Sequence, residues 1–247
     1  MGFYGDKMQE DLLRLKKDLA EILAGNKALK QALREVNKLD MIKASLIVRN
    51  PKHQSLKIDR LLEGELPTDV AVGDFVFIEN YCELVKSAYN NLNMGNSMNA
   101  GLLKAAYRIL EEDPDADYRK DSPVVFAFSH VPPDWQDIDE RLTNSFRRIY
   151  AGRIENDIAA RAMYIHNCVI DIWPFDEYNG ELAIFAMNYY LMEQGFMPID
   201  MPMQRKDYIE LITSCLKGIR VDEEYEFFRE DIVEKMKGTL HACRGYI

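Results

Sequence analysis

The chain has 247 residues, of which 47% are hydrophobic and 29% charged. This composition is ordinary for one globular domain, with or without an appendage, and a chain of this length can bury a core without disulfides or metals. The formal net charge of −10 argues against nucleic acid as a partner, because phosphates would be repelled over much of the surface.

The sequence also argues against a membrane or an oxidising compartment. No stretch approaches the roughly 18 apolar residues that span a bilayer, and the N-terminus lacks the apolar run of a secretory signal. The four cysteines lie far apart without CxxC spacing, which is typical of reduced thiols rather than of a disulfide framework or a zinc site. We therefore expect a cytoplasmic protein with no membrane partner.

The N-terminal region predicts helices followed by a connector. Between residues 7 and 39 the leucines fall on a helical stripe that is interrupted at Gly25-Asn26. We expect two helices, or one kinked helix, that pack on their own domain. A dimer seam stays the alternative, because the heptad repeat is too short to prove a coiled coil. Prolines and a glycine within 49–69 predict a connector with a short helix over 56–62.

The rest of the chain is predicted to be helical, with one exception. Apolar residues recur at helical spacing in the segments 74–92, 100–110, 137–150, 154–172, 180–194, 205–217 and 223–239. Only VVFAFSHV, residues 124–131, has the β-branched and aromatic composition of a strand, bounded by prolines. Tyr118-Arg119 is expected to supply the other arm of a small hairpin. The predicted fold class is mainly α with one small β-hairpin.

The loop WPFDEYNGEL, residues 173–182, joins two of these helices. Asn179-Gly180 predicts a tight turn at the N-terminus of the second helix, where free backbone amides and the helix dipole favour an anion. Every helix has such an end, so a loop of this kind is more often a plain turn than a phosphate site. The neighbouring motifs make the loop more specific.

The stretch WPFDEYNGELAI resembles the signature of the Fic family, His-Pro-Phe-x-Asp/Glu-Gly-Asn-Gly-Arg-x-x-Arg. The positions that match in place are Pro174, Phe175, Glu177, Asn179 and Gly180. Upstream, 118–133 is similar to the family's target-docking flap, whose strand would be Val124, Val125, Phe126, Ala127 and Phe128. Downstream, 195–199 is similar to the usual exit from the second helix. The resemblance implies an N-terminal helical extension and connector, 1–69, and a Fic-like domain, 70–247.

The resemblance also implies a chemistry. Most Fic proteins transfer AMP from ATP to a hydroxyl side chain of a target protein. The motif histidine is the general base, the acidic residue holds Mg²⁺, the glycine-rich turn cradles the phosphates, and the two arginines bind phosphate charge. In this chain Trp173 stands at the position of the histidine and Tyr178 at that of the first glycine. Glu181 and Ile184 stand at the positions of the two arginines.

These four departures act on different parts of the reaction. Indole has no basic lone pair, and general-base catalysis is worth about 10²–10⁴-fold. Tyrosine lacks glycine's freedom to adopt positive φ and adds bulk. Glu181 reverses a charge, and Ile184 offers no donor. We therefore expect that ATP neither binds nor reacts in the family manner, and no catalytic residue is assigned.

Three more residues correspond to positions with family roles. His166 precedes Trp173 by about two helical turns, or ~10 Å, and is expected to be a packing or hydrogen-bonding residue. Glu79 resembles the glutamate of the family's inhibitory helix, but the arginine it would pair with is Ile184, so we expect an exposed carboxylate. Glu177 is the single candidate for holding a metal. A lone carboxylate is more often a solvated surface residue, and no metal is assigned.

Two functions stay open. The first is a Fic-fold protein without AMP transfer and without cofactors, acting by binding or regulating a protein partner, with the flap edge as a docking strand and the N-terminal helices available for a homo-oligomer. The second is a transferase with altered chemistry, moving a nucleotidyl or other phosphoryl-containing group onto a protein hydroxyl with ATP and Mg²⁺. It would use Asp176, Glu177 and Glu181 as its acid–base and ligand set.

Overall fold

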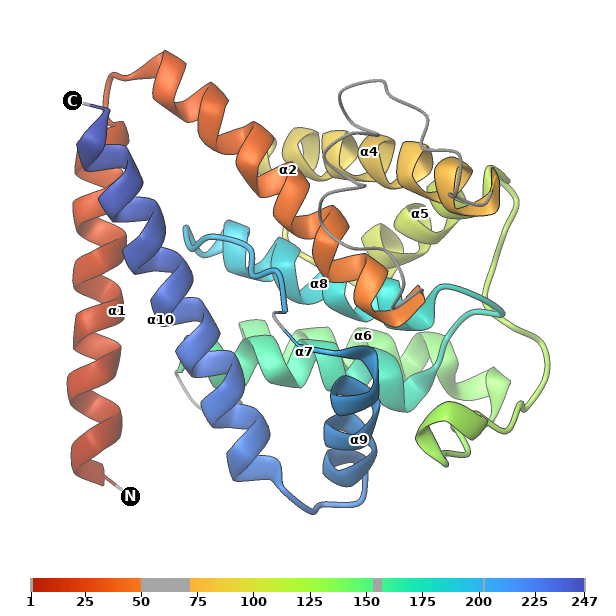
Figure 1. The fold of residues 1–247 in the computed structure, drawn as a ribbon. Coiled ribbons are helices and arrows are strands. Elements are labelled where there is room, and N and C mark those ends of the chain that lie inside the picture. The colour runs from red at the N-terminus through yellow and green to blue at the C-terminus, as the bar shows by residue number, and fades with distance from the viewer. Residues whose placement is uncertain (1, 50–71, 153–156, 202, 247) are drawn as a thin grey trace.

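In the computed structural model, the described residues are 2–49, 72–152, 157–201 and 203–246. They form α-helices joined by loops (Figure 1). The helices are α1 (Gly2–Leu23), α2 (Lys27–Arg49), α4 (Val72–Asn93), α5 (Ala100–Glu111), α6 (Ile138–Tyr150), α7 (Ile158–Ile172), α8 (Asn179–Glu193), α9 (Arg205–Leu216) and α10 (Val221–Gly245). The helices expected from apolar periodicity are present with shifted ends. The short helix expected over 56–62, and the start at 154, lie outside the described residues.

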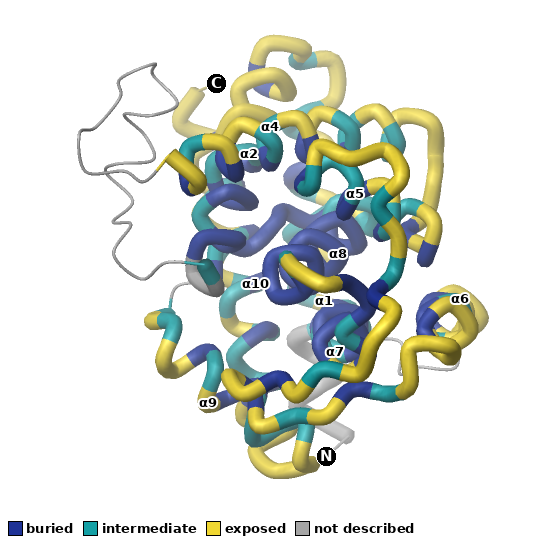
Figure 2. Tube along the Cα trace, turned by 90° about the vertical axis from the view of Figure 1, so that its right-hand side faces the viewer, coloured by how far each residue is buried: buried dark blue, intermediate teal, exposed yellow. Residues whose placement is uncertain are grey.

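The helix α8 forms the centre of the molecule. Every residue from Asn179 to Leu191 is buried, and Figure 2 shows the helix dark blue in the interior. The helices α7 and α2 pack along it, and α4 and α5 also contact it. A helix that is apolar on all sides belongs in a core. Its N-terminus, which the loop from α7 enters, therefore lies against other helices rather than in open solvent.

The N-terminal helices pack on the same body. The helix α1 runs beside α10, and α2 crosses α8 and α4 (Figure 1). Leu12, Leu19 and Leu29 belong to the same hydrophobic cluster as the α8 side chains. The predicted stripe thus packs on its own chain. The helices α1 and α2 join at Gly25, whose φ of +79° is one that glycine adopts at little cost. The division at residue 70 stays a prediction.

The hairpin expected around 124–131 does not form. The segment makes one antiparallel bridge, between Val125 and His130, with a 3-10 turn, η1 (Phe126–Phe128), between them. The expected partner is engaged elsewhere, because the backbone N–H of Arg119 donates to the carbonyl of Pro174 at 3.0 Å. Without a second arm, a β-branched run cannot extend a ladder. The fold remains mainly α, and the small hairpin in the prediction was wrong.

None of the described helices is both long and apolar enough to cross a membrane. The four cysteines are free thiols.

Candidate functional site

The loop between α7 and α8 begins in a left-handed conformation. Trp173 ends α7 with φ 48° and ψ 62°, and its N–H donates to the carbonyl of Val169 at 2.8 Å. Arg119 fixes this end of the loop: Nε donates to the carbonyl of Trp173 at 2.7 Å, and Nη2 donates to that of Ile172 at 3.3 Å. The last carbonyls of a helix need such partners, so the buried Arg119 stabilises the start of the loop.

Phe175 and Asn179 hold the interior of the loop. Phe175 is fully buried, and its ring stacks on Tyr107 with centroids 4.2 Å apart and planes at 20°. The Asn179 side chain accepts from the backbone N–H of Phe175 at 2.9 Å and donates to its carbonyl at 2.7 Å. This pair of bonds closes the loop on itself. Pro174 and Gly180 are buried beside them.

Tyr178 departs from expectation. It adopts φ 60° and ψ 14°, the left-handed conformation that glycine would take, so the prediction that tyrosine gives up positive φ was wrong. The conformation costs about 1–2 kcal/mol for a residue with a Cβ. Stacking of the Tyr178 ring on Phe77, with centroids 5.8 Å apart and planes at 20°, offsets part of this cost. The backbone shape of the turn is therefore kept, and only the added bulk is as predicted.

Glu181 lies in the first turn of α8 and is buried. The Arg49 guanidinium, at the end of α2, lies 4.0 Å from its carboxylate and 3.2 Å from that of Asp74. The same guanidinium is 4.5 Å from the ring centroid of Phe77 and 5.4 Å from that of Tyr178. Burial raises the pKa of Glu181, while its own backbone N–H and the charge of Arg49 oppose the rise. The carboxylate thus stands where the N-terminus of a helix attracts an anion.

A cavity of about 400 Å³ lies between this loop and the 123–128 segment. Its lining includes Trp173, Tyr178, Glu181 and Arg205. The Trp173 ring meets Phe128 edge to face at a centroid distance of 5.8 Å. The wall is therefore largely aromatic and apolar, with one carboxylate and one guanidinium.

The other predicted site residues lie in several environments. Ile184 is fully buried in α8, so this position contributes to the core and not to the loop mouth. Glu79 is exposed on α4, as expected for a helix carboxylate without a partner arginine at 184. Asp176 and Glu177 are exposed, whereas Glu181 is buried, so the three carboxylates do not share one environment. Within the described ranges, no three His, Cys, Asp or Glu side chains converge on a point that could hold a metal ion.

The segment that resembles the flap has an exposed and a buried side. Val125 and Phe128 are buried, whereas Val124, Phe126 and Ala127 are exposed. Phe126 is 87% exposed. This alternation leaves an apolar surface beside the cavity.

His166 lies in the core beneath the loop. Its Nδ1 donates to the side-chain carbonyl of Asn167 and its Nε2 accepts from the Tyr208 hydroxyl, both at 2.8 Å, with the tautomer assigned from these partners. Burial lowers the pKa of His166 to about 4. It is a neutral hydrogen-bonding residue at pH 7, as the sequence predicts, and not a displaced base.

Two functional residues escaped the sequence analysis. Arg49 was expected at the start of the connector over 49–69, yet it reaches Asp74, Glu181 and the two rings. Arg119 was expected in a hairpin, yet its guanidinium binds four carbonyls, including those of Asp121 and Pro133. The sequence associated Arg119 with the loop only through its position directly after Tyr118, in the stretch that resembles the family's flap.

Residues 97–191 match the family model described as the Fic/DOC family. The chain is 33% identical over 101 residues to a protein adenylyltransferase Fic of Nematostella vectensis, a match that covers 39% of this chain and 23% of that protein. The chain therefore spans only about a quarter of the length of that relative.

The fold resembles several solved structures. A Fic-domain-containing signaling protein of Bacteroides thetaiotaomicron superposes with a TM-score of 0.78 at 12% identity, over 95% of this chain and 98% of that one. Fic-1 of C. elegans gives a TM-score of 0.69 at 16% identity, over 98% and 72%. A Fic family protein of Desulfovibrio desulfuricans gives 0.68 at 15%, over 94% and 74%. At these identities the likeness concerns the fold.

Proposed function

From the match of residues 97–191 to the Fic/DOC family model, we propose that the protein is a Fic-fold protein that has lost AMP transfer and acts by binding a protein partner. The similar N. vectensis protein is named a protein adenylyltransferase, so the family reaction is the activity against which the site must be compared. That reaction needs a base, a loop that admits phosphates, and cations that bind their charge.

The observation that carries the proposal is the buried Glu181 at the N-terminus of α8. A nucleotide phosphate would meet this carboxylate at the point where the family places an arginine. Arg49 lies 4.0 Å from this carboxylate and 3.2 Å from that of Asp74, so its guanidinium is already engaged by two carboxylates of the chain. A triphosphate would have to displace the Glu181 carboxylate, or bind beside it in its protonated form, before it reached the helix N-terminus.

Two further features support the loss of the reaction. Trp173 presents an indole beside Phe128, and indole cannot accept the proton of an attacking hydroxyl. Ile184 is enclosed in the core, so no guanidinium projects from that turn of α8. Both the proton transfer and the binding of phosphate charge lack the groups that perform them in the family mechanism.

The exposed apolar side chains next to the cavity support a protein partner. Val124 and Phe126 line the cavity and are 52% and 87% exposed. Exposed apolar side chains at the edge of a cavity are of the kind that marks protein contact sites. A photo-crosslinking residue placed at 126 should capture the partner in cells, while one at exposed Val221, on α10, should not. Capture of a second copy of this chain would instead identify the protein as a homo-oligomer.

A second candidate function is a transferase with altered chemistry. It is favoured by the cavity of about 400 Å³, which stays open beside the loop and carries Arg205 on its wall. Arg205 could meet a phosphoryl group from the α9 side. The candidate has less support, because Asp176 and Glu177 are exposed and do not join Glu181 in one acid–base set.

Calorimetric titration with ATP and Mg²⁺ tests the proposal. We expect no saturable heat at millimolar nucleotide, and no mass increase of one AMP on the protein or on an added hydroxyl-bearing peptide. Micromolar binding would require about 8 kcal/mol from contacts that the proposal denies, and would make the altered transferase the better account.

The variants Trp173→His and Tyr178→Gly, together in one chain, sharpen the same test. They return the base and the glycine but leave Glu181 and Ile184 in place. We expect this double variant to remain inactive, since phosphate binding is still missing. Transfer of AMP by the double variant would show that Glu181 does not exclude the nucleotide.

A further inference from the structure

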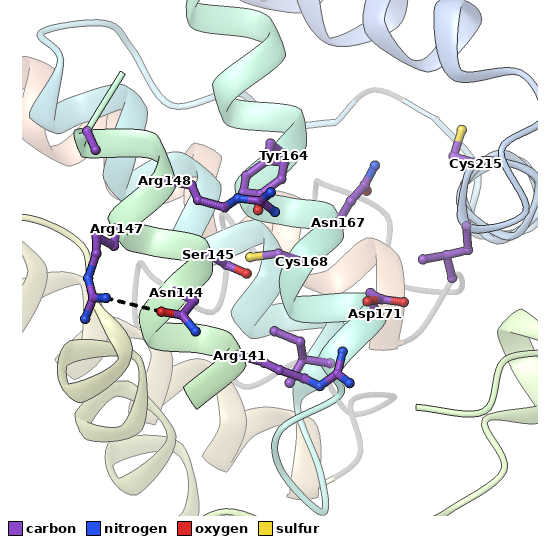
Figure 3. Close-up of a pocket in the computed structure, with 13 residues that line it drawn as sticks. Arg141, Asn144, Ser145, Arg147, Arg148, Tyr164, Asn167, Cys168, Asp171 and Cys215 are labelled. Atoms are coloured by element: carbon purple, nitrogen blue, oxygen red, sulfur yellow. Dashed lines mark hydrogen bonds between the residues drawn. The ribbon is translucent and has the colours of Figure 1, made fainter. Parts of the chain in front are cut away.

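A larger cavity lies away from the loop, in the groove between α6 and α9. Its volume is about 750 Å³, within the range of small-molecule sites. The floor is α7, with Tyr164, Cys168 and Asp171, and the far wall is the end of α9, with Cys215 and Leu216. Figure 3 labels Tyr164, Cys168, Asp171 and Cys215 around the opening. The groove shares no lining residue with the cavity beside the loop.

The α6 wall carries a regular row of polar side chains. Arg141, Ser145 and Arg148 are spaced by four and three residues, so they share one face of the helix. On α7, Tyr164 and Asp171 are seven residues apart and also share a face. Seven residues span about 10 Å of helix, so α6 and α7 each offer two polar groups separated by that distance.

The two ends of the groove differ in charge. Figure 3 shows Arg148 beside Tyr164 at one end, and Arg141 nearer to Asp171 at the other. Within the described ranges no carboxylate pairs with Arg148, and its neighbour Arg147 also lines the cavity. Arg141 already pairs with Asp137 at 3.5 Å. One end is therefore cationic in a protein whose net charge is −10, while charges offset at the other end.

The floor of the groove is held by a buried hydrogen-bond network. Asn167 also lines the cavity, and its amide donates to Glu224 at 2.9 Å while its carbonyl accepts from His166. Glu224 is fully buried, and its Oε1 has no hydrogen-bond partner among the described residues. A polar side chain fixed from behind presents a defined surface to a ligand, which lowers the entropic cost of binding.

From this arrangement we propose that the groove between α6 and α9 binds a small phosphate monoester of a polyol. The phosphate lies at Arg148, where the guanidinium and the hydroxyls of Tyr164 and Ser145 can donate to its oxygens. The hydroxyl groups extend toward Asp171, whose carboxylate accepts hydrogen bonds from them. The charge difference between the ends fixes the direction of the ligand. This site is independent of the function proposed for the loop.

The test is calorimetric titration of the full chain with glucose 6-phosphate, with glucose and inorganic phosphate as the two halves of the probe. We expect saturable binding of glucose 6-phosphate with a dissociation constant below about 1 mM, weaker binding of phosphate, and none of glucose. Arg148→Gln should weaken binding about tenfold or more, the effect of losing a hydrogen bond to a charged group. Asp171→Asn should weaken the binding of glucose 6-phosphate but not the binding of phosphate.

The control is Arg14→Gln, which removes the same charge from an exposed position on α1 that pairs only with Asp11 among its described contacts. It should leave binding unchanged. Equal weakening of binding by Arg14→Gln and Arg148→Gln would show that the effect depends on net charge alone, and would overturn the site. Absence of saturable binding would overturn it as well. Phosphate binding as tightly as glucose 6-phosphate would refute the polyol part of the proposal.

Discussion

The 173–181 loop has an interior, formed by Phe175 and Asn179, and a mouth, formed by Tyr178 and Glu181, and the two parts are held by different kinds of contact. In the interior, Phe175 and Asn179 make the contacts that set the backbone: a ring stack on Tyr107 and two hydrogen bonds across the turn. At the mouth, Tyr178 and Glu181 contact Phe77 and Arg49 of other helices. The interior matches the Fic signature, and the mouth departs from it.

This difference shows that the shape of a loop and its chemistry depend on separate side chains. Tyr178 adopts φ 60°, so the turn survives even where the glycine is absent. What changes is the set of groups that face the cavity, from donors suited to phosphate to a ring and a carboxylate. Under the proposed function, the fold retains the backbone of the turn while the groups at its mouth no longer suit a nucleotide.

The largest loss of stability is expected when a buried side chain is removed from the interior of the loop. Phe175→Ala should lower the free energy of unfolding by about 3–5 kcal/mol, because it removes a fully buried ring and leaves a cavity against Tyr107. Chemical denaturation measures this. Phe126→Ala is the matched control, since that ring is 87% exposed, and it should change stability by less than about 0.5 kcal/mol. Equal effects at the two positions would remove the distinction between interior and surface.

A smaller effect, which depends on pH, is expected at His166 beneath the loop. Burial lowers the pKa of His166 to about 4 from an ordinary 6.5, so below pH 6.5 the unfolded chain binds a proton that the folded chain does not. Its contribution to stability is present above pH 6.5 and is lost as pH falls to 4. The loss amounts to about 3 kcal/mol.

The difference in unfolding free energy between wild type and His166→Gln, measured from pH 7 to pH 4, isolates this effect. Subtracting the variant cancels the titration of groups outside the hydrogen-bond network of His166. The wild type should lose its advantage over the variant as pH falls. His241→Gln, at an exposed position on α10, should keep the wild-type slope. A constant difference between wild type and His166→Gln would mean that His166 is accessible to protons in the folded state.

Much of the interior could be predicted from the sequence, and much of the mouth could not. Apolar periodicity gave the helices, because each buries one stripe or, for α8, its whole surface. Phe175 and Asn179 were predictable, because their bonds lie within five residues of each other. Arg49 was not, because its partners at 74 and 181 are distant in the chain, and no local pattern records such a contact.

The prediction of a strand over 124–131 failed for a related reason. Its composition favours a strand, but a strand needs a partner, and Arg119 was committed to the loop carbonyls instead. Strand propensity reflects the fit of side chains to a pleated surface, so it cannot predict a ladder where no neighbouring arm is free. The backbone conformation of Tyr178 could not be predicted for the same reason, since the stack that offsets part of its strain is formed with the distant Phe77.

The smallest effect is expected for the ion pair at the mouth. In a double-mutant cycle, Arg49→Met and Glu181→Gln should show a coupling energy of about 1 kcal/mol, because the charges are 4.0 Å apart and Arg49 is partly exposed. Arg49→Met with Asp74→Asn is the matched cycle, and it should give a larger coupling because that distance is 3.2 Å. A coupling of zero between positions 49 and 181 would mean that Glu181 lacks its counter-charge. The buried carboxylate would then be open to a cationic ligand, and the mouth would be a binding site rather than a closed one.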